Sequence, residues 1–225
     1  FYMADQANPT IRNSDVSDNK AGHMGGGMSI LEHSYPDIQG ISMMGNTAIN
    51  GGGVAMGQSA KPLFRNCVLT RNQAAKTGGG MLAQGNATPV LINTTISSNA
   101  AGDAGGGFAM SQFAAPQLYS SYISGNQARL GGGLLTEATV TPMLNSTLIT
   151  GNAAESGGGV YGLGFTPHLC EAASTFYIRN NKASATGGGC YFRLDDQAVE
   201  LCDGMWLLTR VHKGEPGFPP PPQPA

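Results

Sequence analysis

Apolar residues recur at every second position in short runs along this chain, and glycine or proline bounds each run. One run follows a triple glycine, as in Met28-Ser-Ile30. A second lies two places after a proline, at Ile11, Ile38, Phe64, Leu91, Leu118, Leu144 and Leu169. A third lies three places before an asparagine, at Val16, Met43, Leu69, Ile96, Ile123, Ile149 and Ile178. A period of two is typical of strands that bury one face. The pattern therefore predicts three short strands per unit.

Triple glycines, prolines and asparagines recur with the same period as these runs, so the chain is built from internal repeats. Triple glycines start at Gly25, Gly51, Gly78, Gly105, Gly131, Gly157 and Gly187. Prolines stand at Pro9, Pro36, Pro62, Pro89, Pro116, Pro142 and Pro167. We therefore expect an all-β solenoid of about seven coils of 26–27 residues. A helical solenoid is excluded, because a triple glycine and a proline in every unit would cost several kcal/mol in helices.

The marker asparagines are Asn19, Asn46, Asn72, Asn99, Asn126, Asn152 and Asn181. One interpretation is ligand or metal coordination along a polar stripe. The favoured one is an internal amide ladder, in which each asparagine occupies a left-handed corner and bonds the coils above and below it. The alanine two places after each asparagine predicts a tight inward corner.

The combination Asn-x-Ala followed by Gly-Gly-Gly and an apolar residue, as in Asn152 to Val160, resembles known repeats. It is similar to those of right-handed parallel β-helix proteins, the pectin-lyase-like superfamily. Among these it resembles the repeats of chlamydial polymorphic outer-membrane proteins and of large protist and algal surface proteins. The resemblance covers residues 1–189 and implies a right-handed parallel β-helix. It implies little about activity, because the matching residues are structural.

Charge and site chemistry exclude several functions. With 12 Lys and Arg against 14 Asp and Glu, the chain is no strongly basic nucleic-acid binder. No apolar run approaches the roughly 20 residues that span a bilayer. The carboxylates scatter, the only doublet is Asp195-Asp196, and the histidines never recur in a column. No phosphate-binding loop follows from the glycines, since none is followed by the Lys-Ser/Thr pair it needs. We therefore expect no catalytic carboxylate pair, no metal and no cofactor.

The outward columns suggest surfaces. The position two places after the triple glycine predicts a partly apolar stripe, interpreted either as ordinary surface or as a docking face for another chain or segment. Its larger members are Tyr2, Leu82, Leu135, Tyr161 and Tyr191. A second outward column is rich in Ser and Thr, a pattern that suggests an ice-binding face. Met44 and Arg179 interrupt this column, which argues against that hypothesis.

Three sequons, at Asn86, Asn93 and Asn145, favour secretion and glycosylation. Cys67 and Cys190 occupy inward positions, and Cys67 is interpreted as a core thiol. A Cys170–Cys202 disulfide is one of the possible pairings, chosen as a guess.

We divide the chain into β-helix repeats at 1–189, a C-terminal cap at 190–212 that covers the open sheet end, and a proline-rich linker at 213–225. The four consecutive prolines of the linker predict an extended polyproline II spacer. This segment resembles the hydroxyproline-rich segments of green-algal wall and flagellar glycoproteins. Because Phe1 lines up with the residue after a triple glycine, we expect the native chain to continue upstream.

The first functional hypothesis is a non-catalytic, extracellular structural or adhesion module of a larger surface or filament glycoprotein, such as a cell-wall or flagellar assembly. Its partners would be other chains or segments of that assembly, and possibly glycans. Two alternatives stay open. One is a β-helix protein that binds or degrades polysaccharides, and the other is a segment of a bacterial autotransporter-like passenger.

Overall fold

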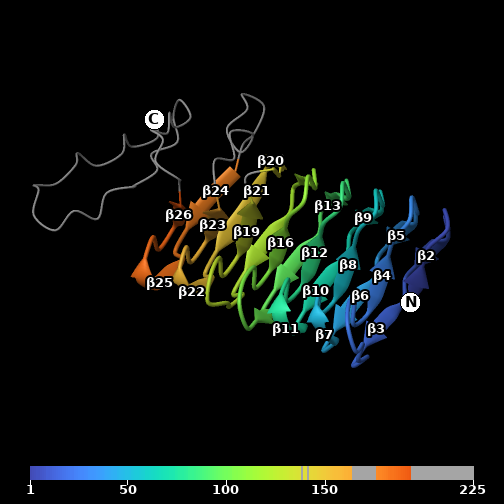
Figure 1. Ribbon diagram of the computed structural model, residues 1–225, viewed down its shortest axis with the longest axis horizontal. Helices are drawn as coiled ribbons and strands as arrows, with labels where there is room; N and C mark the ends of the chain where they lie inside the picture. The colour runs from blue at the N-terminus through green and yellow to red at the C-terminus, as the bar shows by residue number, and fades with distance from the viewer. Residues whose placement is uncertain (138, 141, 164–175, 194–225) are drawn as a thin grey trace, which may run out of the picture.

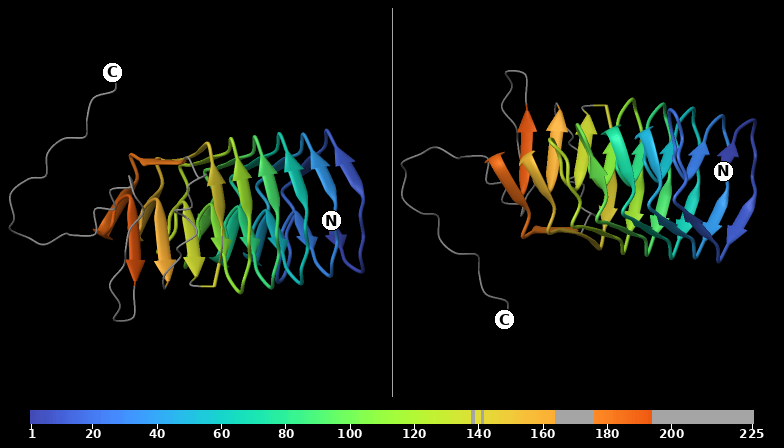
Figure 2. Two further views of the ribbon diagram at one scale, coloured as in Figure 1. Left: turned by 90° about the horizontal axis from the view of Figure 1, so that it is seen from above. Right: turned by 90° about the horizontal axis from the view of Figure 1, so that it is seen from below.

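The chain winds into a rod of stacked coils, as a computed structural model shows (Figure 1). The structure describes residues 1–137, 139–140, 142–163 and 176–193, and among these it contains strands and turns but no helix. The coils follow one another along the long axis in sequence order, so each strand lies beside the corresponding strand of the next coil (Figure 2). We number the coils 1 to 7 by their marker asparagines, from Asn19 to Asn181.

Three parallel sheets form the walls of the rod, as the sequence predicted. Sheet A contains β1 (Tyr2–Met3), β4 (Met28–Ile30), β8 (Val54–Met56), β12 (Met81–Ala83), β16 (Phe108–Met110), β19 (Leu134–Glu137), β23 (Val160–Leu163) and β26 (Cys190–Arg193). Sheet B contains β2 (Thr10–Arg12), β5 (Asp37–Gln39), β9 (Leu63–Arg65), β13 (Val90–Ile92), β17 (Gln117–Tyr119) and β20 (Met143–Asn145). Sheet C contains β3 (Asp15–Ser17), β6 (Ser42–Met44), β10 (Val68–Thr70), β14 (Thr95–Ser97), β18 (Tyr122–Ser124), β21 (Thr147–Thr150) and β24 (Phe176–Arg179).

Equivalent residues of successive coils pair directly, so each apolar column stacks on itself. In sheet C, Leu69 pairs with Ile96 and Ile96 with Ile123. These side chains are fully buried in one continuous core that also holds Phe64 and Phe108. Alternate residues of each strand thus point into the core and away from it, as the period of two in the sequence predicts.

The last strand of sheet A extends the solenoid past the boundary that the sequence suggested. Residues 190–193, assigned above to a cap, form β26 and pair in parallel with β23. The remainder of that cap segment and the proline-rich linker lie outside the described residues, as does the proposed Cys170–Cys202 disulfide.

A fourth, short strand projects between the marker asparagine and the triple glycine of several coils; we call this segment the lobe. The lobe strands are β7 (Thr47–Asn50), β11 (Gln73–Thr77) and β15 (Ala100–Ala101), and separately β22 (Ala153–Ser156) and β25 (Lys182–Thr186). Where lobes of different length pair, the register shifts, as it does between Ala74 and Thr77.

The length of the lobe explains why some coils have 26 residues and others 27. From Gly25 to Asn152, glycine to proline is always 11 residues and proline to asparagine always 10. The lobe then has four residues in coils 2, 5 and 6 and five in coils 1, 3, 4 and 7. All length variation in this part of the chain therefore falls outside the three walls.

The marker asparagines form the predicted ladder. Asn99 Oδ1 accepts from both the backbone N and the Nδ2 of Asn72, at 2.9 and 3.0 Å. Asn99 Nδ2 in turn donates to the carbonyl oxygen of Leu69 and to Asn126 Oδ1, each at 3.0 Å. The same asparagine-to-asparagine bonds join consecutive rungs from Asn19 to Asn181. Central rungs are fully buried, whereas Asn19 is exposed.

One detail of the ladder was predicted wrongly. The left-handed residue is not the asparagine but its predecessor, in each of the seven coils: Asp18, Gly45, Arg71, Ser98, Gly125, Gly151 and Asn180, with φ between 54° and 68°. The corner is made one residue earlier so that the asparagine side chain can point inward along the stack.

In the triplets from Gly25 to Gly159 all three glycines are required sterically. The first, such as Gly51 with φ 61°, adopts a left-handed conformation that side chains disfavour. The second approaches backbone of the next coil: a Cβ on Gly52 would lie 2.5 Å from the carbonyl oxygens of Gln73 and Gly79. A Cβ on the third, such as Gly53, would lie 2.6 Å from the carbonyl oxygen of Gly80 in the next coil. The triplet therefore lets the chain turn out of the lobe and into sheet A under another layer of backbone.

Candidate functional site

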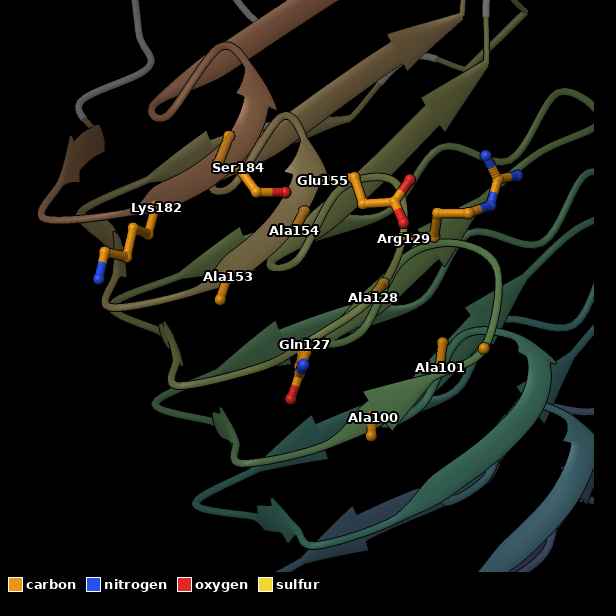
Figure 3. A pocket seen from close by; sticks show the side chains of 12 residues that line it. Ala100, Ala101, Gln127, Ala128, Arg129, Ala153, Ala154, Glu155, Lys182 and Ser184 are labelled. Carbon is orange, nitrogen blue, oxygen red and sulfur yellow. The ribbon is translucent and has the colours of Figure 1, made fainter.

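A groove of about 630 Å³ runs along the lobes of coils 4 to 7. A column of alanines runs along it, including Ala101, Ala128 and Ala154. Polar side chains flank this column, with Gln127 and Lys182 on one side and Arg129, Glu155 and Ser184 on the other (Figure 3).

The groove follows from the lengths of the lobes. The lobes of coils 5 and 6 have four residues, and those of coils 4 and 7, on either side, have five. The pairing between lobe strands is also interrupted at coil 5, where Gln127 and Leu130 make only isolated bridges. Two consecutive short lobes between longer ones thus leave a hollow in the side of the rod.

The charged groups of the groove do not converge on one point. Glu155 extends toward Arg129, whereas Lys182 points away from both (Figure 3). The groove therefore offers an apolar floor with dispersed polar edges, a surface suited to packing or weak binding rather than to acid–base chemistry.

The alanine column is buried, but not in the main core. Ala74, Ala101 and Ala128 form a small cluster of their own in the lobes. The sequence predicted that these alanines form a tight inward corner. The corner lies in the lobe instead, because the chain turns away from sheet C at the marker asparagine.

The predicted docking stripe on sheet A is not a free surface along most of its length. Leu82, Leu135 and Tyr161 point away from the main core, yet they are only 4%, 6% and 5% exposed. Lobe residues cover them: Ala104 and Leu130, each next to a triple glycine, pack in the same cluster. Alternation identified the outer face correctly, but the fold-back of the lobe left no sign in the period-two pattern.

Only the ends of that stripe are accessible. Tyr2 is 70% exposed in the first strand. Tyr191 is half-buried and stacks on Tyr161, with ring centroids 5.2 Å apart. The column therefore behaves as a second, minor core beneath the lobes.

Two acidic residues that sequence reasoning treated as scattered stand in one column. Asp5 and Glu32 follow the paired residues Met3 and Ile30 by the same two positions. The backbone N of Asp5 donates to Glu32 Oε2 at 3.3 Å. Counting positions from the triple glycine would have found this pair.

A third carboxylate is held by arginines of both neighbouring coils. Asp37 Oδ1 accepts from Arg65 at 2.6 Å, and its other oxygen lies 3.8 Å from Arg12. This arrangement ties three successive strands of sheet B together at the surface.

The sequons differ in accessibility. Asn86 and Asn93 are exposed at left-handed corners, with φ of 61° and 48°. Asn93 Nδ2 donates to Asn66 Oδ1 at 2.8 Å. Asn145 is half-buried within β20, and Thr147 of its sequon is buried. Glycosylation at all three remains a prediction.

Cys67 and Cys190 carry free thiols in the described part of the chain. Cys67 lies in the core, where its Sγ donates to the carbonyl oxygen of Arg65 at 3.3 Å. Burial raises the pKa of the Cys67 thiol. Cys190 packs against the same core, and burial raises its pKa to about 12.

The described residues offer neither a metal-ligand cluster nor a membrane-spanning helix. These contain no group of three or more His, Cys, Asp or Glu side chains placed to hold a metal ion. They contain no helix long and apolar enough to cross a membrane.

Comparison with known families agrees with this geometry. A family model described as the right handed beta helix region matches residues 1–166. The chain belongs to the right-handed β-helix family. No curated protein and no solved structure matches it. As a β-helix protein it shares an architecture that occurs both with and without catalysis, so family membership leaves the activity open.

Proposed function

We propose that this β-helix is a non-catalytic structural module of an extracellular surface or filament assembly. One observation carries the proposal: the residues that recur in every coil all serve the stacking of one coil on the next. The asparagines bond each other, the glycines admit neighbouring backbone, and the apolar columns fill the core. Outward residues change from coil to coil.

Such stacking suits a load-transmitting rod. Every coil bonds to its neighbours through three sheets and an amide ladder, so stability accumulates from interfaces between repeats. With strands about 4.8 Å apart, seven coils extend for roughly 34 Å. A repeat of this kind can set a distance between the segments attached to its ends.

An extracellular location is supported by the positions of two sequons. Asn86 and Asn93 present exposed amides at corners, where a glycan would meet solvent rather than the core. The resemblance of the Asn-x-Ala…Gly-Gly-Gly unit to surface-protein repeats supports the same setting.

The test is a screen of the purified chain against neutral and uronic-acid polysaccharides, with release of reducing ends and of unsaturated products as readouts. We expect no turnover above that of a heat-inactivated sample. The acidic column provides the decisive variants, Asp5→Asn and Glu32→Gln. Turnover that either variant abolishes would refute the structural role and establish a polysaccharide-active enzyme.

Secretion is tested separately, by expressing the chain behind a signal peptide in a eukaryotic host. We expect glycosylation, measured as a mass loss on enzymatic deglycosylation, and expect Asn86→Gln and Asn93→Gln each to remove one glycan. An unmodified secreted chain would contradict the glycoprotein part of the proposal.

A further inference from the structure

The outward face of sheet C carries the exposed apolar column that sequence analysis placed on sheet A. Val68, Tyr122 and Tyr177 stand in one line of paired residues, 42%, 50% and 66% exposed. Leu148 lies between the two tyrosines in the same line. Exposed aromatic and apolar side chains in a row mark a candidate contact surface.

The central part of this face has no charge. In coils 2 to 6, every outward position of β6, β10, β14, β18 and β21 carries an apolar or hydroxyl side chain. The hydroxyl column includes Thr70 and Ser97, whose oxygens lie 3.5 Å apart. A face made of apolar and hydroxyl side chains can pack without burying an unpaired ion.

The two ends of the face carry opposite charges. Asp15 and, at the following corner, Asp18 are exposed in coil 1. Arg179 is exposed in coil 7. The strand residues of the face are thus acidic at one end, basic at the other and uncharged over the roughly 29 Å between them. Arg71, at the corner of coil 3 equivalent to Asp18, is also exposed.

We propose that a second copy of this chain packs on the sheet C face, with the two rods antiparallel and related by a two-fold axis along the strand direction at coil 4. Coil 1 of one copy then lies over coil 7 of the other, so at both ends the partner's Arg179 faces Ser17, which lies between Asp15 and Asp18. An isologous contact of this kind uses one surface twice.

Side-chain size agrees with this arrangement. The axis pairs coil 2 with coil 6 and coil 3 with coil 5, column against like column. Leu148 then faces Ser42, Met44 faces Thr150, and Tyr122 faces Val68, so each larger group meets a smaller one. At each end of the contact Tyr177 faces Asp15. At the axis, Thr95 and Ser97 meet their own copies.

A parallel face-to-face pair is excluded by charge. It would place each coil over its own copy, so the acidic ends would meet each other and the basic ends likewise. Like charges brought together at an interface cost several kcal/mol.

The contact is small, so the dimer is weak. The face is three residues wide and seven coils long, roughly 10 by 34 Å, which puts the interface at the low end of the known size range. The inference rests on the proposed structural function, because a weak lateral contact becomes useful when an assembly holds many copies side by side.

Sedimentation equilibrium of the full chain tests the proposal, with Ser97→Asp as the main variant because it places two like charges at the axis. We expect concentration-dependent dimers of the native chain and at least a tenfold rise in Kd for Ser97→Asp. The matched control is Gln58→Glu, which adds one negative charge at an exposed turn after sheet A and should leave Kd unchanged.

Ser17→Asp decides the orientation. In the antiparallel pair it faces the partner's Arg179 and should lower Kd, whereas in a parallel pair it would face the partner's Asp15 and raise it. Circular dichroism checks that each variant folds, and Tyr122→Lys replaces Ser97→Asp should the latter fail that check.

A chain that stays monomeric up to about 1 mM, or dimers that Ser97→Asp and Tyr122→Lys leave intact, would overturn the proposal. Failure here leaves the structural role standing. Glycan turnover, in contrast, would refute that role whatever the oligomeric state.

Discussion

Asn99 donates to a single oxygen, Asn126 Oδ1, twice: from its side-chain Nδ2 at 3.0 Å and from its backbone N at 2.9 Å. Each rung therefore secures both the side chain and the main chain of the coil before it. Since these groups are buried, losing one rung leaves several polar atoms without partners.

Asn99→Ala should lower the free energy of unfolding by about 3 kcal/mol or more, because buried unsatisfied groups each cost about 1–3 kcal/mol. Asn19→Ala, at the exposed end of the ladder, should cost about 1 kcal/mol or less because water replaces the lost partners. Urea denaturation of both variants measures the difference. Equal losses would show that burial does not set the strength of a rung.

Ile96→Asp should prevent folding, because it places an unpaired charge in a fully buried column. Its neighbour Ser97 faces outward, so Ser97→Asp should change the melting temperature little. Thermal denaturation followed by circular dichroism compares them. Similar melting temperatures would mean that the inward and outward faces of sheet C are interchanged.

Gly52→Ala should destabilise the chain severely, since its Cβ would lie 2.5 Å from backbone atoms of the next coil that have no room to move. Gly22 is the matched control, because a Cβ there meets nothing within 4 Å. Gly22→Ala should be neutral or slightly stabilising. Urea midpoints of the two variants check this, and a mild effect of Gly52→Ala would contradict the close approach of the layers.

Thr136→Val should stabilise the protein. The Thr136 hydroxyl is fully buried and has no hydrogen-bond partner among the described residues, in a column where other coils place Ala83 and Met110. Valine keeps the shape and removes the unsatisfied group, for an expected gain of about 1 kcal/mol. A lower melting temperature than that of the native chain would show that the hydroxyl is satisfied.

Cys67 should make stability fall at alkaline pH. Its pKa is raised in the folded state from the ordinary value of 9.0, so above that pH the unfolded chain releases a proton that the native thiol retains. The stabilisation is complete below about pH 9 and declines as pH rises. Cys67→Ala should remove this part of the pH dependence, measured as the difference in unfolding free energy between variant and native chain from pH 7 to 10.

Much of the fold could be predicted from the sequence because every coil of a β-helix repeats the same pattern of residues. The columns of Ile96 and Asn99 recur seven times, and stacking requires like residues to meet. The burial of Leu82 could not be predicted in this way. Alternation shows on which side of a strand a residue lies, but not which segment covers that side. The groove depends on lobe length, which the sequence encodes in the spacing between each marker asparagine and the following triple glycine.

The surfaces were harder to predict than the core. Tyr122 and Tyr177 stand two coils apart and share no repeat motif, so only the register shows that they line up. Asp5 and Glu32 seemed unrelated until the turn after sheet A placed them in one column. Pairs of this kind depend on counting from the correct marker in every coil.

The part of each coil that forms sheets A, B and C has a constant number of residues, whereas the lobe has four or five. The molecule is therefore divided into a part that cannot change length and a part that can. A peptide inserted beside Ala75 or Gly102 would leave the strand pairing of sheets A, B and C in register. The lobes are thus natural grafting points, and a series of rods differing only there would display chosen sequences at fixed intervals along one edge.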